Sequence, residues 1–172
     1  MERLAIALML IGLAAPVGAR QFIAKADDFR CLLDGTKAPG MHFYVFHRKK
    51  AALKKAMHKL TTGTLGKGLP VGTIVQLVPF EAMVKRGGKF NRDGNGWEFF
   101  SLKPNADGTT EILARGTTDL LSAFTHTSCQ GCHQQLAADH DSICEFVKGT
   151  SGIGLTDDLL AIIQNGDPRC KK

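Results

Sequence analysis

The chain has 172 residues, of which 44% are hydrophobic and 22% charged, and its 22 Lys and Arg against 16 Asp and Glu give a formal net charge of +6. This length provides one domain with a buried core, and the apolar content excludes a disordered chain. The densest basic run, residues 47–59, has helical spacing and no interleaved aromatic residues. We interpret it as a solvated helix face and not as a nucleic-acid or membrane patch.

The first 19 residues have the pattern of a signal peptide. The charged start "MER" precedes the apolar run "LAIALMLIGLAAPV", and "VGA" supplies small residues for cleavage. We predict cleavage after Ala19, which leaves residues 20–172 as a single periplasmic or secreted domain. A membrane anchor is the alternative, but a spanning helix needs about 20 apolar residues. Export would place the chain where disulfides can form.

Hydrophobic periodicity and turn residues predict the elements that follow. In chain order we expect a helix over residues 22–33, a strand over 41–47, a helix over 49–60, strands over 71–80, 97–102 and 109–115, and helices over 117–124 and 156–166. Alternation in the strand over 97–102 sends Trp97 and Phe99 to one face. Hairpins with helices at both ends predict an α+β fold, an antiparallel β-sheet domain with flanking helices.

The stretch "SCQGCHQQLAADHD" holds Cys129, Cys132 and His133 in a C-x-x-C-H pattern. With this composition the pattern arises by chance in about one shuffled chain in 200, so it carries information. A zinc site uses four ligands, usually in two separated pairs, and the sequence has no second C-x-x-C and no H-x-x-x-H. A redox dithiol would follow a strand of a βαβ unit, a pattern that this chain lacks.

Covalent attachment of a haem fits the motif best. Thiols three residues apart on a helical turn lie on one side, where each can form a thioether with a haem vinyl group, and the next residue can direct an imidazole at the iron. We predict one haem c (iron) per chain, near the C-terminus, tethered by Cys129 and Cys132. His133 is then the proximal metal ligand.

The sixth iron position decides what such a protein does. A cytochrome with histidine and methionine ligands usually has its methionine far downstream of C-x-x-C-H, but Met41, Met57 and Met83 all precede His133. The other histidines lie in polar stretches, at His42, His47, His58, His126 and His140. We therefore expect an open, five-coordinate iron that binds a small ligand. An electron-transfer cytochrome with a distal histidine is the alternative.

These features resemble the cytochrome P-460 family and its gas-binding relatives, the cytochromes c-prime-beta, in which C-x-x-C-H lies near the C-terminus of a mostly β chain. The segment "VGTIVQLVPFEAMVKRGGKFNRDGNGWEFFSL" is similar to the family's glycine-threonine strand, E-A-x-V-K segment and tryptophan-aromatic strand. "DSICEF" and "DPRCKK" resemble a subgroup of bacterial members. The resemblance spans about residues 40–170. The helical cytochromes c-prime are excluded, because their four-helix bundle cannot hold these strands.

The resemblance also suggests an activity. In members that oxidise hydroxylamine, a lysine is cross-linked to the haem, and its position falls on Leu77 here; their distal arginine falls near Met41. Lys85 does not match the cross-linking position. Because leucine cannot form the bond, the resemblance favours a protein that binds nitric oxide or a related small ligand. An enzyme that oxidises hydroxylamine or transforms a nitrogen oxide is the alternative.

Further site residues are implied by the same resemblance. Glu81 matches a carboxylate that the family's enzymes hold near the distal pocket, where it could move protons as a catalytic group; a solvent-facing glutamate at a strand end is the plain alternative. Leu77, Phe80 and Phe99 are expected to line the haem face, although a strand phenylalanine can equally be plain core. Trp97 is assigned to core packing.

The remaining cysteines and the partners are also inferred from the resemblance. The subgroup pattern implies a disulfide from Cys144 to Cys170, while Cys31 could be buried or join two subunits. Expected partners are a small gaseous or nitrogen-oxide ligand, a redox protein and a second copy of the chain in a homodimer. No nucleic-acid contact, and no membrane contact after signal cleavage, is expected.

Overall fold

The computed structural model describes residues 21–87, 89–146 and 154–170. The predicted signal peptide, residues 1–19, lies outside these residues. Within the described part of the chain, no helix is both long and apolar enough to cross a lipid bilayer.

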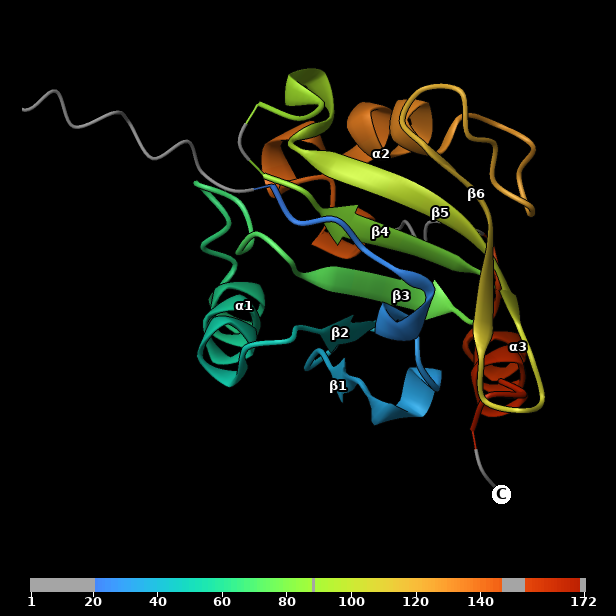
Figure 1. The fold of residues 1–172 in the computed structure, drawn as a ribbon. Helices are drawn as coiled ribbons and strands as arrows, with labels where there is room; N and C mark the ends of the chain where they lie inside the picture. The colour runs from blue at the N-terminus through green and yellow to red at the C-terminus, as the bar shows by residue number, and fades with distance from the viewer. Residues whose placement is uncertain (1–20, 88, 147–153, 171–172) are drawn as a thin grey trace, which may run out of the picture.

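Six strands form one antiparallel sheet in which neighbours in sequence are neighbours in space (Figure 1). They are β1 (Thr36–Lys37), β2 (Tyr44–Phe46), β3 (Ile74–Val78), β4 (Glu81–Lys85), β5 (Trp97–Pro104) and β6 (Thr110–Gly116). The α+β class and the antiparallel sheet are confirmed. Such local pairing is the usual arrangement of consecutive strands.

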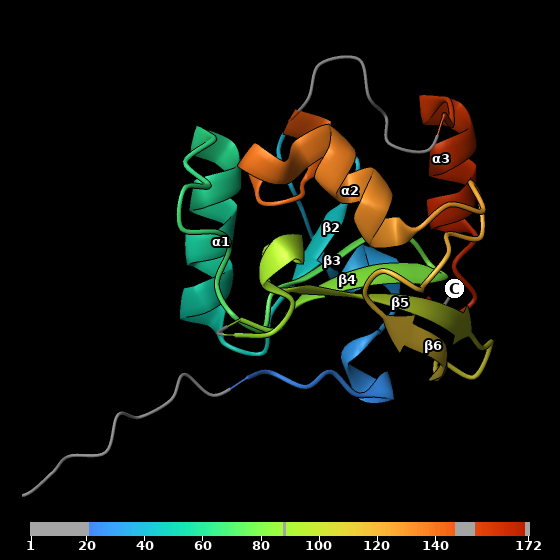
Figure 2. The same cartoon turned by 90° about the horizontal axis from the view of Figure 1, so that it is seen from above.

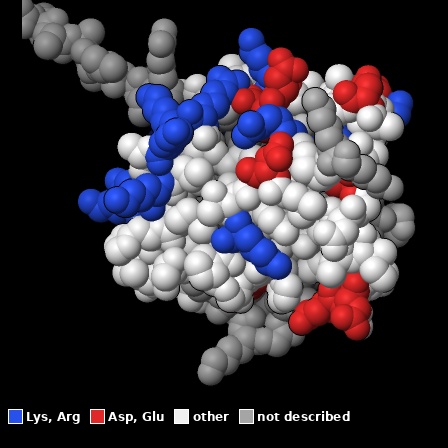
Figure 3. All heavy atoms as spheres, turned by 90° about the horizontal axis from the view of Figure 1, so that it is seen from below, with Lys and Arg blue, Asp and Glu red and all other residues white. Residues whose placement is uncertain are grey.

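Three α-helices lie on one face of the sheet, and the N-terminal segment lies on the other (Figure 2). The helices among the described residues are α1 (Lys50–Thr62), α2 (Cys129–Ala137) and α3 (Asp157–Asn165). The helices expected over 49–60 and 156–166 are therefore confirmed. Lys50, Lys54 and Lys55 of α1 are exposed, and Figure 3 shows basic side chains gathered on the side where α1 lies.

The alternation of β5 divides the apolar side chains between two cores. Trp97 and Phe99 belong to the core beneath the helices, and Phe100 and Leu102 to the core beneath the N-terminal segment. Trp97 is fully buried, as expected. The pairing register places Met83 of β4 next to Val75 on one side and Phe99 on the other. This row of apolar side chains faces the helices and lines the sheet side of the space between the helices and the sheet.

The prediction of a helix over residues 22–33 is wrong. Two short 3-10 turns, Ala26–Asp28 and Leu32–Asp34, stand there instead. The reason is tertiary, because Asp167 Oδ2 accepts the N–H of Leu32 at 2.7 Å and Arg169 Nη1 donates to the carbonyl of Phe29 at 3.1 Å. An α-helix would use those backbone groups internally.

The prediction of a helix over residues 117–124 is also wrong, because the segment is a folded loop. Its backbone groups pair across the loop: Ser122 N donates to Thr127 O at 2.9 Å, and Cys129 N donates to Leu120 O at 2.9 Å. The N–H of Ala123 donates to Glu81. These bonds engage backbone groups that a helix over the same residues would pair internally.

β4 was not expected as a strand, because "EAMVK" has little β-branched content. It becomes a strand by pairing: Glu81 is opposite Val78 on β3, and Lys85 is opposite Trp97 on β5. The position between two strong strands outweighs the weak local propensity.

The disulfide implied by the resemblance, Cys144 to Cys170, is contradicted. Cys170 is bonded to Cys31 across 139 residues of sequence. The C-terminal "DPRC" segment packs on the N-terminal segment through the Asp167 and Arg169 bonds just described, which brings Cys31 and Cys170 together. Cys144 instead lies near α2, where its Sγ is 3.4 Å from His133 Nδ1.

We predict that replacing Cys31 and Cys170 by Ser lowers the free energy of unfolding by roughly 4–5 kcal/mol, since the bridge closes almost the whole chain. Urea unfolding of the oxidised protein measures this loss. Cys144→Ser is the control, because it should leave the peptides of Cys31 and Cys170 cross-linked in a non-reducing peptide map. Loss of that cross-link in Cys144→Ser would show that the pairing is different.

Candidate functional site

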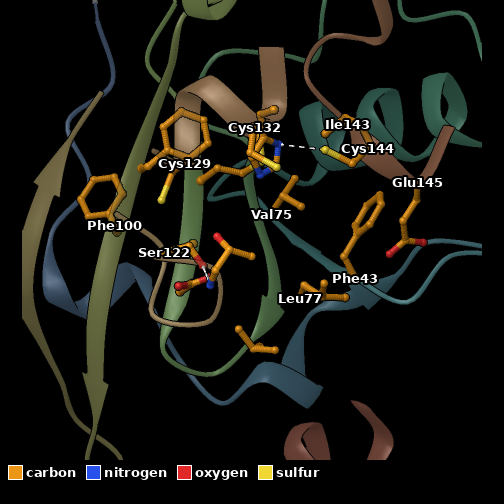
Figure 4. Close-up of a pocket in the computed structure, with 17 residues that line it drawn as sticks. Phe43, Val75, Leu77, Phe100, Ser122, Cys129, Cys132, Ile143, Cys144 and Glu145 are labelled. Carbon is orange, nitrogen blue, oxygen red and sulfur yellow. Dashed lines mark hydrogen bonds between the residues drawn. The ribbon is translucent and has the colours of Figure 1, made fainter. Parts of the chain in front are cut away.

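A cavity lies between the helix-covered face of the sheet, α2 and the loop over residues 117–128 (Figure 4). Its apolar walls come from strands and loops: Phe43, Val75, Leu77, Val78, Met83, Phe99 and Ile143. The cavity measures about 120 Å³, and the whole hollow, counted out to its open mouth, about 910 Å³. Mostly apolar walls with a few polar groups are typical of small-molecule and cofactor sites.

Six of the seven predicted site residues line this cavity. They are Leu77, Glu81, Phe99, Cys129, Cys132 and His133. Phe80 is not among the lining residues; it lies in the turn between β3 and β4 and packs on Phe124 with ring centroids 5.1 Å apart. Phe80 therefore lies outside the described lining of the cavity, and its assignment to the haem face stays a prediction. Met41 packs against the core beneath the helices and does not line the cavity.

The C-x-x-C-H residues lie on the first turns of α2. Ser128 caps the helix, because its hydroxyl accepts the N–H of Gly131 at 3.1 Å, and the same hydroxyl donates to the carbonyl of Thr118 at 2.7 Å. Cys129, Cys132 and His133 follow at helical spacings of three and four, which places them on one side of the helix. Figure 4 shows both cysteine side chains beneath α2, with Cys129 on the side of Phe100 and Cys132 on the side of Val75.

The His133 ring is held in one tautomer. Its Nδ1 lies 2.7 Å from the carbonyl oxygen of Ser142, and because a carbonyl can only accept, Nδ1 carries the proton. Burial lowers the pKa of His133 and outweighs the opposing effect of the Ser142 carbonyl, so the ring is neutral at pH 7. Nε2 then has an unshared electron pair, the arrangement found in histidines that ligate metals. The ring of Phe99 packs beside it at 5.2 Å.

Cys129 and Cys132 are thiols and are not joined to each other. Burial, reinforced by the negative charge of Glu81, raises the pKa of the Cys129 thiol to about 11. A redox dithiol needs the opposite, a lowered thiol pKa that supplies the reactive thiolate. The environment of Cys129 therefore argues against a thiol-disulfide exchange centre.

A zinc site is not preformed around these residues. Within the described part of the chain, the one close group of three candidate ligands is Cys31, Asp167 and Cys170. Two of its members are already bonded to each other. Among the described residues, Cys129, Cys132 and His133 do not themselves form such a close group, whereas structural zinc requires four ligands.

Glu81 has a structural partner that the sequence did not indicate. It begins β4 and is half-buried at the cavity. Its Oε1 accepts the N–H of Ala123 at 2.6 Å. The carboxylate thus links β4 to the loop that precedes α2. Its negative charge lies close to the thiol of Cys129.

Glu145 is a second carboxylate at the cavity, and the sequence analysis missed it. Its Oε2 accepts the backbone N–H of His42 at 2.8 Å, and the His42 ring lies 3.3 Å from Asp157. Burial raises the pKa of Glu145, and the bonds from His42 oppose this only in part.

The residues fit a covalently bound haem by their chemistry. Two thiols and a neutral imidazole with Nδ1 already bonded lie on one side of one helix, at an apolar cavity. The cavity of about 120 Å³ is smaller than the roughly 300–1,000 Å³ of complete cofactor sites. A group as large as a porphyrin would therefore extend into the open mouth, with Cys129 and Cys132 as its tethers and His133 as its ligand.

No known family model, curated protein or solved structure matches the chain. The resemblance to the cytochrome P-460 family therefore stays a prediction, and the geometry of the cavity is the basis on which function is inferred.

We predict that Glu81→Ala lowers the free energy of unfolding by roughly 1–3 kcal/mol, because it leaves the N–H of Ala123 without its charged acceptor. Glu81→Gln keeps an oxygen acceptor and should retain most of the stability. Urea unfolding measures both, and amide hydrogen exchange at Ala123 should accelerate in Glu81→Ala alone. Equal stability of the wild type and Glu81→Ala would indicate a solvent-facing glutamate.

Proposed function

We propose that the chain is an exported mono-haem c protein whose iron has an open sixth position and binds nitric oxide or a related small, uncharged ligand. The observation that carries the proposal is the convergence of Cys129, Cys132 and His133 on one apolar cavity, with His133 Nδ1 donating to the Ser142 carbonyl. Residues 1–19 direct export in this proposal.

Each residue has a role that follows from its contacts. Cys129 and Cys132 would hold the porphyrin through thioether bonds, and His133 Nε2 would bind the iron. The bound haem would supply an iron atom able to take a diatomic ligand or an electron. Val75, Leu77 and Phe99 exclude water and offer no hydrogen bond, which suits an uncharged ligand better than an anion.

The cavity supports ligand binding better than hydroxylamine oxidation. Leu77, at the position of the cross-linking lysine in the resemblance, is a cavity residue, and among the described residues no lysine lines the cavity. Each of the two carboxylates there accepts a backbone N–H through one oxygen: Glu81 from Ala123 and Glu145 from His42.

The test is expression of the full chain with machinery for covalent haem attachment. We expect a coloured protein whose haem resists extraction by acid and organic solvent, with a high-spin ferric spectrum that changes on addition of nitric oxide. Cys129→Ala with Cys132→Ala should lose the covalent haem, whereas the matched control Cys144→Ala should keep it. A colourless wild-type protein, or one that purifies with zinc, would refute the proposal.

A second candidate function is electron transfer, and Met83 favours it. Its side chain lines the cavity between Val75 and Phe99, and a methionine thioether is a common sixth ligand in electron-carrying cytochromes. A distal histidine as the sixth ligand has less support, because His133 is the sole histidine among the cavity-lining residues that the structure describes.

The substitution Met83→Leu separates the two candidates. If the sixth position is open, we expect Met83→Leu to leave the high-spin spectrum and nitric oxide binding nearly unchanged, because the two side chains are similar in volume. A wild-type low-spin spectrum that Met83→Leu converts to high-spin would instead identify an electron carrier.

A further inference from the structure

A buried ion pair lies behind the segment that holds His133. Lys85, at the end of β4, donates through Nζ to Asp141 Oδ1, and the two side chains are 8% and 5% exposed. Asp141 Oδ2 accepts the N–H of Leu69 at 2.7 Å, and Lys85 Nζ also donates to the carbonyl of Asn95 at 2.5 Å. Neither charge faces the cavity of the haem site, so the pair has no direct part in ligand binding.

The pair holds an unusual turn. Asp141 and Ser142 both have left-handed backbone conformations, with φ of 53° and 61°. Residues with a Cβ atom disfavour this region, so two in succession persist because their surroundings hold them. Trp97 Nε1 donates to the carbonyl of Asp141 at 2.7 Å, and Gln134 Nε2 donates to Ser142 Oγ at 2.6 Å.

This turn sets the direction of one carbonyl group. The carbonyl of Ser142 is the acceptor of the His133 Nδ1 proton at 2.7 Å. Its orientation depends on the backbone angles of Asp141 and Ser142, and the Asp141 side chain is anchored to the sheet through Lys85. The sheet, the turn and the imidazole therefore form one connected set of hydrogen bonds.

We propose that Lys85 and Asp141 are positioning residues for the His133 imidazole, acting through the left-handed turn that aims the Ser142 carbonyl at Nδ1. The inference deepens the proposed function and rests on it, because a partner that accepts the Nδ1 proton orients a ligating histidine and raises its basicity toward a metal. Removal of either member of the pair should loosen the turn and weaken the same hydrogen bond.

The test compares Lys85→Met and Asp141→Asn in the haem-loaded full chain. We expect both substitutions to shift the ferrous iron–histidine stretching band to lower frequency and to raise the haem reduction potential, since a weaker Nδ1 bond makes the imidazole a poorer donor. Fluorescence of Trp97, the single tryptophan of the chain, should change in both, because its indole is bonded to the same turn.

The direction of the potential separates positioning from a purely electrostatic effect. Loss of the negative charge in Asp141→Asn would raise the potential, whereas loss of the positive charge in Lys85→Met would lower it. Shifts of opposite sign, with an unchanged stretching band, would overturn the proposal. A loss of stability in both variants without any change in band or potential would overturn it as well.

Glu98→Gln is the matched control. Glu98 is 6% exposed and is bonded by Arg86 and Arg115. Arg115 also donates to the carbonyl of Ala24, which belongs to the core on the other face of the sheet. This variant should lose stability but leave the iron–histidine band in place. A band that moves as much in Glu98→Gln would count against a specific role of the pair.

Failure of the proposed function can be told apart from failure of this inference. If the purified full chain contains no haem, the proposed function is wrong. The same variants are then compared by ¹⁵N NMR of histidine, which reports the ring tautomer. The inference predicts a His133 ring protonated at Nδ1 in the wild type and a mixture of tautomers in both variants; an unchanged His133 signal would overturn it.

Discussion

The hydrogen bond from His133 Nδ1 to the carbonyl of Ser142 is the interaction on which the site depends. It joins the helix that carries the cysteine motif to a turn nine residues later, and it decides which ring nitrogen is left to act. In the other tautomer Nε2 would carry the proton and could not bind a metal. In the proposed haem protein this nitrogen would bind the iron of the group that Cys129 and Cys132 hold, so a backbone carbonyl would select the ligand atom of the site.

The strong strands were predictable, and the weak one was not. Residues 74–78 and 97–102 are rich in β-branched or aromatic side chains, which local propensity favours. β4 lacks that composition and exists because β3 and β5 flank it. Residues 117–124 illustrate the reverse case, since their helical pattern yields to bonds with Glu81 and within the loop. Local patterns fail where distant residues supply the partners of the backbone.

The residues of the site also differ in how far the sequence predicts them. The motif formed by the cysteines and His133 was recognisable because its spacing is local. Leu77, Phe99 and Glu81 line the same cavity, and their part in a haem face stays a prediction. The roles of Glu145 and Ser142 could not be predicted, because they arise from contacts that form only in the folded chain. The pairing of Cys31 with Cys170 could not be predicted either, because it depends on packing between the N-terminal and C-terminal segments of the chain.

That pairing has a consequence for how the chain acquires its covalent bonds. Synthesis proceeds from the N-terminus, so Cys31 is available long before Cys170. Oxidation in order of emergence would join Cys31 to Cys129 or Cys132, and would consume a thiol that the proposed thioether bonds require. The native bridge therefore demands either delayed oxidation or reshuffling through thiolate attack. Under the proposed function, the enzymes that oxidise thiols and those that attach the haem to Cys129 and Cys132 would compete for the same nascent chain.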